Sequence, residues 1–203
     1  MNRQADVSPP PTITEPETAV AQVADPARTA DSPTPRGTSP TRPAETTPHA
    51  RRPASPAVPG PSGLVVPVQG ILPGQLSNTF QDARSGGRVH NALDIMAPKG
   101  TPVLAVADGR VEKLFDSEQG GLTLYQFDPA GNYAYYYAHL DSYAPGVAEG
   151  KSLRRGEVIG YVGSTGNATP EAPHLHFAVF LLGPEKQWWK GTAINPYPLL
   201  AGT

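Results

Sequence analysis

The sequence predicts an all-β domain preceded by a disordered, proline-rich tail, and two observations carry this prediction. Residues 1–62 contain fourteen of the chain's 25 prolines and no Leu, Phe, Trp or Tyr. A segment of that composition cannot bury enough apolar surface to offset the entropy lost on ordering. Residues 63–203 hold every aromatic side chain, in short runs separated by Gly, Pro and Asp turns. Such runs are typical of an all-β fold.

The strand-like runs follow one another at short intervals: 89–95, 102–107, 110–115, 122–127, 133–140, 157–162 and 173–180. Asp108-Gly109 lies between two of these runs and predicts a β-hairpin. Further turns are expected at 119–121 and 128–132, which are rich in Gly, Asp and Asn. No stretch shows a sustained helical period, and residues 143–151 are too rich in Gly and Pro for more than a helical turn or two.

Composition excludes several classes of function. The formal net charge is −2, and the tail's six basic residues balance its six acidic ones, so no nucleic-acid partner is predicted. The chain has no cysteine, which excludes disulfides and thiolate metal sites. The most apolar run, 64–72, is short and broken by Pro67 and Gly70, so no membrane span is predicted. No apolar segment follows Met1, so no signal peptide is predicted either.

Two of the five histidines, His174 and His176, alternate with Leu175 and Phe177 in the last strand-like run. Side chains at i and i+2 leave a strand on the same face, so the two imidazoles project together while the apolar residues point into a core. Paired imidazoles on a rigid element suit a metal site or a proton-transfer site. The alternative is a pair of surface histidines on an edge strand.

A metal site needs further ligands, and His90 and Asp94 are candidates. Their spacing places both on one face of a strand, or brings them together across a turn. With His176 they make a set of two histidines and one carboxylate, and catalytic zinc commonly takes three protein ligands and leaves the fourth position for water. His139 and His174 then remain for proton transfer and charge stabilisation. The chain has no His-Glu-x-x-His sequence, which excludes the thermolysin arrangement.

Over residues 70–200 the chain resembles the lysostaphin/LytM-type zinc endopeptidases. Four motifs in the family's order carry the resemblance: His90-x-x-x-Asp94, Tyr-Ala-His-Leu at 137–140, Gly-Ser-Thr-Gly-Asn-Ala at 163–168 and His174-Leu-His176-Phe177. Gly-Thr-Pro-Val at 100–103 and Asn-Pro-Tyr-Pro at 195–198 flank them. Each motif alone is a weak signal, but four in order are specific.

The resemblance implies a fold and a set of roles. The fold is a mainly antiparallel, β-sandwich-like catalytic domain at 63–203 with a cleft above the sheet. One Zn²⁺ ion is expected on His90, Asp94 and His176, with His139 and His174 as catalytic histidines. His174 is the better-placed general base, and His139 stabilises the oxyanion or protonates the leaving amine. Which imidazole does which stays open at the level of sequence.

The implied substrates are stem peptides or cross-bridges of bacterial peptidoglycan, which places the protein outside the cytoplasm, in the periplasm or cell envelope. A tail at 1–62 that tethers such a domain fits this location, although no export signal is visible; a bare extension is the alternative. The oligomeric state is not predicted. A second reading is a non-catalytic or partner-regulated LytM-like module that binds cell wall or activates another hydrolase. All five matched positions are intact, which favours the enzyme. Biotinyl or lipoyl carrier domains share the Gly-rich hairpins, but the chain lacks their Met-Lys-Met-type tip.

The chain departs from the family's pattern at two places. Ala92 replaces the usual Gly between the first two ligands, and Phe80-Gln81 replaces the usual Phe-Gly, which leaves the conformation of the preceding loop open. Asn78 is a candidate for the extra, inhibitory ligand of some relatives.

Other residues carry weaker expectations. Tyr137 is expected to pack in the core, with a hydrogen bond in the cleft as the alternative. Trp188 and Trp189 are expected either to form the floor of a substrate groove or to pack in the core. Ser164 and Asn167 are candidates for substrate contact, because their loop leads into the His-Leu-His strand.

Overall fold

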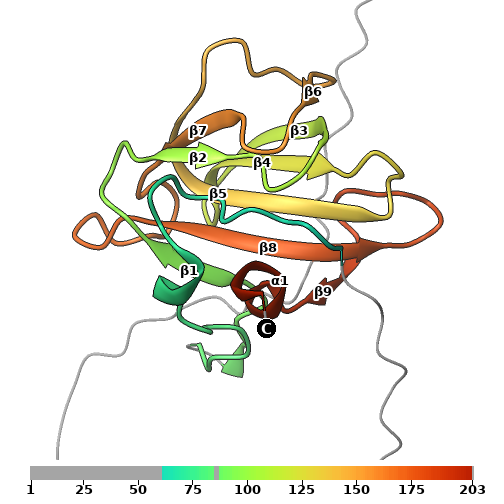
Figure 1. Ribbon diagram of the computed structural model, residues 1–203. Coiled ribbons are helices and arrows are strands. Elements are labelled where there is room, and N and C mark those ends of the chain that lie inside the picture. The colour runs from blue at the N-terminus through green and yellow to red at the C-terminus, as the bar shows by residue number, and fades with distance from the viewer. Residues whose placement is uncertain (1–60, 85–86, 203) are drawn as a thin grey trace, which may run out of the picture. The chain divides into compact units, whose positions relative to one another are not determined.

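The computed structural model describes residues 61–84 and 87–202. The predicted tail, 1–62, lies outside the described residues except for its last two. The described chain forms one sheet, and a short helix is the first and the last element along the chain (Figure 1). The elements are η1 (Pro73–Gln75), β1 (Leu93–Met96), β2 (Pro102–Leu104), β3 (Gly109–Ser117), β4 (Gly121–Phe127), β5 (Tyr133–Tyr143), β6 (Ser152–Leu153), β7 (Val158–Val162), β8 (His174–Leu182), β9 (Gly191–Ile194) and α1 (Pro196–Ala201).

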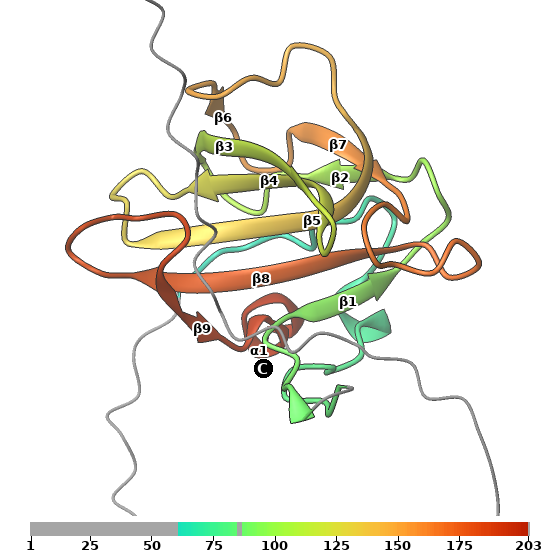
Figure 2. The ribbon, with the colours of Figure 1, turned by 180° about the vertical axis from the view of Figure 1, so that it is seen from behind.

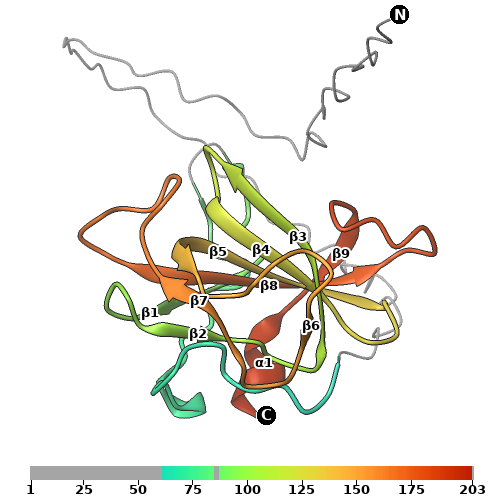
Figure 3. The ribbon, with the colours of Figure 1, turned by 90° about the horizontal axis from the view of Figure 1, so that it is seen from above.

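The nine strands form a sheet whose main path runs β1-β8-β5-β4-β3-β6. β9 pairs with one end of β8, and β7 pairs with both β5 and β2 (Figures 2 and 3). All of these pairings are antiparallel. The prediction of a mainly antiparallel all-β domain is therefore confirmed. Within the described residues no helix has the length and apolar character needed to cross a membrane.

The predicted hairpin at Asp108-Gly109 is wrong. β2 pairs with β7, and β3 pairs with β4 and β6, so the residues before and after this turn do not pair with each other. The Asp108 carboxylate instead accepts a hydrogen bond from the Arg155 backbone N–H at 2.8 Å. A side chain at Gly109 would overlap the carbonyl oxygen of Phe127, so the glycine serves a close approach of strands. The turns expected at 119–121 and 128–132 do join paired strands, β3 to β4 and β4 to β5.

β8 is an interior strand, because β1 and β5 pair along its two edges. Leu175, Phe177 and Val179 are fully buried in the core on one face. His174 and His176 alternate with them and so lie on the opposite face, as predicted. The alternative of an edge-strand histidine pair is excluded.

The helix α1 escaped the sequence analysis, although its start carries a recognisable signal. The Asn195 side chain accepts a hydrogen bond from the Tyr197 N–H at 2.9 Å, and Pro196 occupies the first helical position. An N-cap asparagine followed by proline is a typical helix start. Gly202, with φ of 72°, ends the helix, and Leu200 is buried in the core.

Tyr137 packs in the core, and the alternative of a cleft position is wrong. Its ring is fully buried and contacts Phe177 at a centroid distance of 5.3 Å. Its hydroxyl donates to Gln126 Oε1 at 2.7 Å and accepts from the Val106 N–H at 3.0 Å. Gln126 in turn donates to the Ala107 carbonyl at 2.7 Å. This network satisfies the polar atoms buried between β4, β5 and the segment after β2.

Candidate metal centre

The three predicted ligands meet at one point. His90 Nε2 lies 3.1 Å from Asp94 Oδ1 and 3.2 Å from His176 Nδ1, and Asp94 Oδ1 lies 3.0 Å from His176 Nδ1. Zinc bonds of about 2.0–2.2 Å at tetrahedral angles separate two ligand atoms by roughly 3.3–3.5 Å. The triangle matches that spacing to within a few tenths of an ångström. Three such atoms from two imidazoles and a carboxylate therefore fit a metal ion.

Strand pairing fixes two of these ligands. In the antiparallel register of β1 and β8, Asp94 lies opposite His176 and Met96 opposite His174. Directly opposed residues share a face of the sheet, so the carboxylate and the imidazole project together. The sequence predicted the ligands but not this register, which depends on pairing between segments 82 residues apart.

His90 lies outside the strands and is fixed by hydrogen bonds. Its N–H donates to the Asp82 carbonyl at 3.0 Å, and its carbonyl accepts from the Gln81 N–H at 2.7 Å. Its ring Nδ1 lies 2.8 Å from the Thr79 carbonyl. A carbonyl can only accept, so Nδ1 carries the proton and Nε2 keeps its lone pair for a metal. Thr79 Oγ1 also accepts from the Asp94 N–H at 3.0 Å, a supporting role that no motif had indicated.

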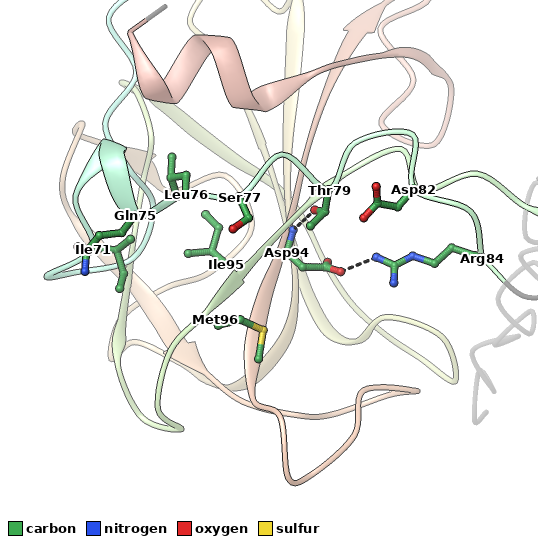
Figure 4. Close-up of a pocket in the computed structure, with 10 residues that line it drawn as sticks. All are labelled: Ile71, Gln75, Leu76, Ser77, Thr79, Asp82, Arg84, Asp94, Ile95 and Met96. Atoms are coloured by element: carbon green, nitrogen blue, oxygen red, sulfur yellow. Dashed lines mark hydrogen bonds and ion pairs between the residues drawn. The ribbon is translucent and has the colours of Figure 1, made fainter.

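Asp94 divides its two oxygens between different partners. Oδ1 faces the two histidines, while Oδ2 accepts a hydrogen bond from Arg84 Nη2 at 2.6 Å (Figure 4). Burial pushes the pKa of this carboxyl upward, but the close contacts of Oδ1 with the imidazoles of His176 and His90 outweigh burial and hold the pKa well below its usual range. Asp94 is therefore ionised, as a metal ligand must be.

A cavity of about 370 Å³ adjoins this carboxylate. Thr79, Arg84 and Asp94 contribute to its lining at one end, and Ile71 and Ile95 at the other (Figure 4).

The imidazole of His176 is neutral. Burial lowers its pKa, and the hydrogen bond to Asp94 opposes that effect without reversing it. A neutral imidazole also has the tautomer with its lone pair on Nδ1, and this is the form that binds a metal ion at that atom.

His174 stands next to the three ligands with its own orientation fixed. Its Nδ1 lies 2.9 Å from the Ala172 carbonyl and therefore carries the proton. Its Nε2 lies 3.9 Å from Asp94 Oδ1, too far for a direct hydrogen bond. The basic nitrogen of His174 is thus directed towards the ligand cluster.

His139 reaches the same face through a β-bulge. Leu140 of β5 lies opposite Leu122, but Tyr137 lies opposite Leu124, so β5 has one extra residue in this interval. His139 has φ of 61°, in the left-handed region. Ala138 lies opposite His176, so regular alternation would turn residue 139 to the other face.

The bulge instead brings the His139 ring to centroid distances of 5.0 Å from His174 and 5.5 Å from His176. Its Nδ1 lies 2.8 Å from the Thr165 carbonyl, which leaves Nε2 as the acceptor. Burial lowers the pKa of His139 to about 4, with the Thr165 hydrogen bond acting in the opposite direction.

The loop at 163–168 holds His139 in place. Thr165 Oγ1 donates to the Leu140 carbonyl at 2.8 Å and accepts from the Leu122 N–H at 3.0 Å. Asn167 donates its amide to Gln119 Oε1 at 2.8 Å. Asn167 therefore has a structural partner here, and its substrate contact stays a prediction, as does that of Ser164.

The remaining expected residues divide between packing and exposure. Trp188 packs on Tyr125 at a centroid distance of 4.9 Å, whereas Trp189 is 44% exposed. Tyr125 also packs on Tyr136, whose ring lies 6.1 Å from that of His176. An aromatic surface therefore extends from the ligand cluster to Trp188. Asn78 is exposed, and its Oδ1 accepts from the Phe80 N–H at 3.3 Å.

The site is of the kind found in metal-dependent hydrolases: a His-Asp-His triangle on an antiparallel sheet, with two further imidazoles beside it. Comparison with known families agrees: the family model described as Peptidase family M23 matches residues 88–196. The chain belongs to this family, and the sequence-based resemblance is confirmed.

Individual relatives show the same likeness. The chain is 35% identical over 130 residues to the L-Ala--D-Glu endopeptidase of Bacillus subtilis (strain 168), covering 61% of this chain and 38% of the relative. It is 34% identical over 115 residues to lysostaphin of Staphylococcus simulans, covering 56% of this chain and 22% of the relative. The chain thus spans well under half the length of these curated relatives.

Among solved structures, the catalytic domain of the antimicrobial peptidase lysostaphin from Staphylococcus simulans matches with a TM-score of 0.52 and 30% identity. The match covers 60% of this chain and 88% of that domain. The structure of LytU matches with a TM-score of 0.51 and 34% identity, covering 61% and 81%.

Proposed function

We propose that this protein is a zinc-dependent endopeptidase that hydrolyses peptide cross-links or bridges of bacterial peptidoglycan. One observation carries the proposal: three ligand atoms 3.0–3.2 Å apart have two further imidazoles beside them. Membership of peptidase family M23 and the likeness to lysostaphin and to an L-Ala--D-Glu endopeptidase support the choice of substrate.

His90 Nε2, Asp94 Oδ1 and His176 Nδ1 would hold a single ion. Two imidazole nitrogens and one carboxylate oxygen at tetrahedral spacing suit Zn²⁺, and three protein ligands leave one position open. When bound, zinc supplies a Lewis acid for the scissile carbonyl and lowers the pKa of a coordinated water to about 7.

His174 acts as the general base. Its Nδ1–H is committed to the Ala172 carbonyl, so Nε2 is free to take a proton from the attacking water. Its Nε2 lies 3.9 Å from Asp94 Oδ1, so a water oxygen to one side of this line can lie within hydrogen-bond distance of both atoms. The proton then passes from Nε2 to the leaving amine nitrogen, which breaks the peptide bond and restores the neutral imidazole.

His139 supports the reaction from a position beside both His174 and His176. Its lowered pKa, about 4, keeps the imidazole of His139 neutral near pH 7 in the resting state. A neutral ring with Nδ1–H bonded to Thr165 offers an acceptor at Nε2. It therefore orients water or the leaving amine, and it stabilises an oxyanion only after gaining a proton.

The substrate places the protein outside the cytoplasm, in the periplasm or cell envelope. The partners are peptidoglycan stem peptides or cross-bridges. Residues 1–62 would act as a tether between an attachment point and the domain. Fractionation of cells that express the native gene tests this location, and a purely cytosolic product would contradict it.

The decisive experiment incubates the zinc-loaded chain with purified sacculi and identifies the released muropeptides by mass spectrometry. We expect His174→Ala to retain zinc but to lose release by roughly 10²–10⁴-fold, the usual contribution of a general base. His90→Ala should lose both zinc and release. Release that persists in His174→Ala would refute the role of His174, and zinc-loaded wild-type protein that releases nothing would refute the proposed function.

A further inference from the structure

We propose that Arg84 is a positioning residue of the metal centre, which holds Asp94 in one-oxygen coordination and so keeps a position open for the attacking water. The inference rests on the proposed function and adds a residue that no motif of the sequence had marked. It begins from the unequal surroundings of the two carboxylate oxygens of Asp94.

The two oxygens are held by opposite partners. Oδ1 lies 3.1 Å from His90 Nε2 and 3.0 Å from His176 Nδ1, which places it at the metal position. Oδ2 lies 2.6 Å from Arg84 Nη2, on the side of the cavity in Figure 4. Because hydrogen bonds between ions are short and strong, Arg84 fixes the rotation of the carboxylate about its last bond.

The backbone of Asp94 cannot move to compensate. Its N–H donates to Thr79 Oγ1 at 3.0 Å, and its position in β1 is fixed opposite His176. The carboxylate can therefore change its position only by rotating about its last bond. The hydrogen bond from Arg84 to Oδ2 opposes this rotation.

Arg84 is itself anchored, although its side chain is 40% exposed. Its N–H donates to the Arg88 carbonyl at 2.9 Å, and Ala83 and Val89 form an isolated antiparallel bridge. His90 directly follows Val89 of this bridge. The same local backbone pairing therefore supports both Arg84 and the first metal ligand.

The chemical consequence follows from how carboxylates bind metals. With Oδ2 released, both oxygens can coordinate, which raises the coordination from four ligands to five and crowds the position that the attacking water needs. Loss of the guanidinium also removes a positive charge that repels the metal ion. Removing Arg84 should therefore leave metal binding unchanged or tighter while catalysis falls. A purely structural role predicts the opposite, weaker binding.

The test uses the full chain with Co²⁺ in place of zinc, because the visible absorption of Co²⁺ weakens when its coordination rises from four ligands to five. The variants are Arg84→Met, Arg84→Gln as a second neutral replacement should Arg84→Met not fold, and Arg84→Lys. The matched control is Arg110→Met, because Arg110 Nη2 also lies 2.6 Å from a carboxylate oxygen, that of Glu112, away from the metal ligands. Zn²⁺ affinity is measured by competition with a chromophoric chelator, and activity by release from sacculi.

We expect the neutral Arg84 variants to lose visible Co²⁺ absorption, to bind Zn²⁺ at least as tightly as the wild type, and to release muropeptides about 10–100-fold more slowly. Arg84→Lys should recover part of the absorption, because the lysine ammonium can still donate a hydrogen bond to Oδ2. Arg110→Met should match the wild type in all three measurements. An unchanged Co²⁺ spectrum or weaker Zn²⁺ binding in the neutral variants would overturn the inference alone. A wild-type chain that binds neither metal would overturn the proposed function and the inference with it.

Discussion

The buried imidazole of His139 should make the metal-free protein sensitive to mild acid. His139 is 6% exposed, and burial lowers its pKa from 6.5 to about 4. The informative change is His139→Asn. Asparagine tolerates the left-handed backbone at this position, φ of 61°, and its side-chain amide can still donate to the Thr165 carbonyl.

The direction of the change in the free energy of unfolding follows from how many protons the native and the unfolded chain bind at residue 139. Between pH 6.5 and pH 4 the unfolded chain binds a proton at residue 139 and the native state does not, so the free energy of unfolding falls as the pH falls. The difference between the pKa of 6.5 in the unfolded chain and about 4 in the native state corresponds to roughly 3 kcal/mol, at about 1.36 kcal/mol per pKa unit. Between pH 7 and pH 5 about 2 kcal/mol of this should be lost.

The assay is urea unfolding of chelator-treated wild type and His139→Asn at pH 7, 6 and 5. We expect the wild type to lose about 2 kcal/mol more than the variant over this range. The pKa of His176 is also lowered, but His176 is present in both proteins, so the comparison isolates residue 139. Parallel pH profiles of the two proteins would refute the inference that burial keeps His139 neutral.

Two further substitutions test the core network and the support of the metal ligands. Tyr137→Phe removes the hydroxyl that bonds Gln126 Oε1 and the Val106 N–H, and we expect a loss of about 2–4 kcal/mol in urea unfolding because two buried groups lose their partner. Thr79→Val removes the acceptor of the Asp94 N–H, and we expect the zinc dissociation constant to rise at least about 10-fold in chelator competition.

Conservative variants provide the controls. Tyr161→Phe, at a half-buried position of β7, should change the free energy of unfolding far less than Tyr137→Phe, and equal losses would contradict the network argument. Thr79→Ser keeps the hydroxyl and should bind zinc nearly as well as the wild type. Equal zinc affinity of Thr79→Val and the wild type would show that the hydroxyl does not support the site.

The parts of the site that sequence could predict are those governed by local periodicity. His174 and His176 share a face because a strand alternates its side chains, and the core positions between them are apolar for the same reason. The all-β fold could likewise be predicted from short runs and turns. The choice of ligands came from ordered motifs, and the structure brings His90, Asp94 and His176 together.

The parts that sequence missed depend on pairing between distant segments. Asp108-Gly109 marks a turn, but nothing local tells that β2 pairs with β7 rather than with β3. The bulge that redirects His139 arises from the register of β5 against β4, and no periodic pattern encodes it. Arg84 belongs to none of the motifs that the sequence offered, because its partner lies on a strand ten residues later.

Gln81, where the resemblance led us to expect glycine, has an unusual backbone conformation. Gln81 has φ of 73°, a backbone conformation that glycine adopts freely and other residues adopt at a cost of roughly 1–2 kcal/mol. Its N–H bonds the His90 carbonyl at 2.7 Å, and the next residue, Asp82, accepts from the His90 N–H at 3.0 Å. The left-handed residue therefore forms part of the backbone contact that positions the first ligand. These two backbone hydrogen bonds to His90 require the left-handed conformation at residue 81, so the fold keeps it although the residue is not glycine.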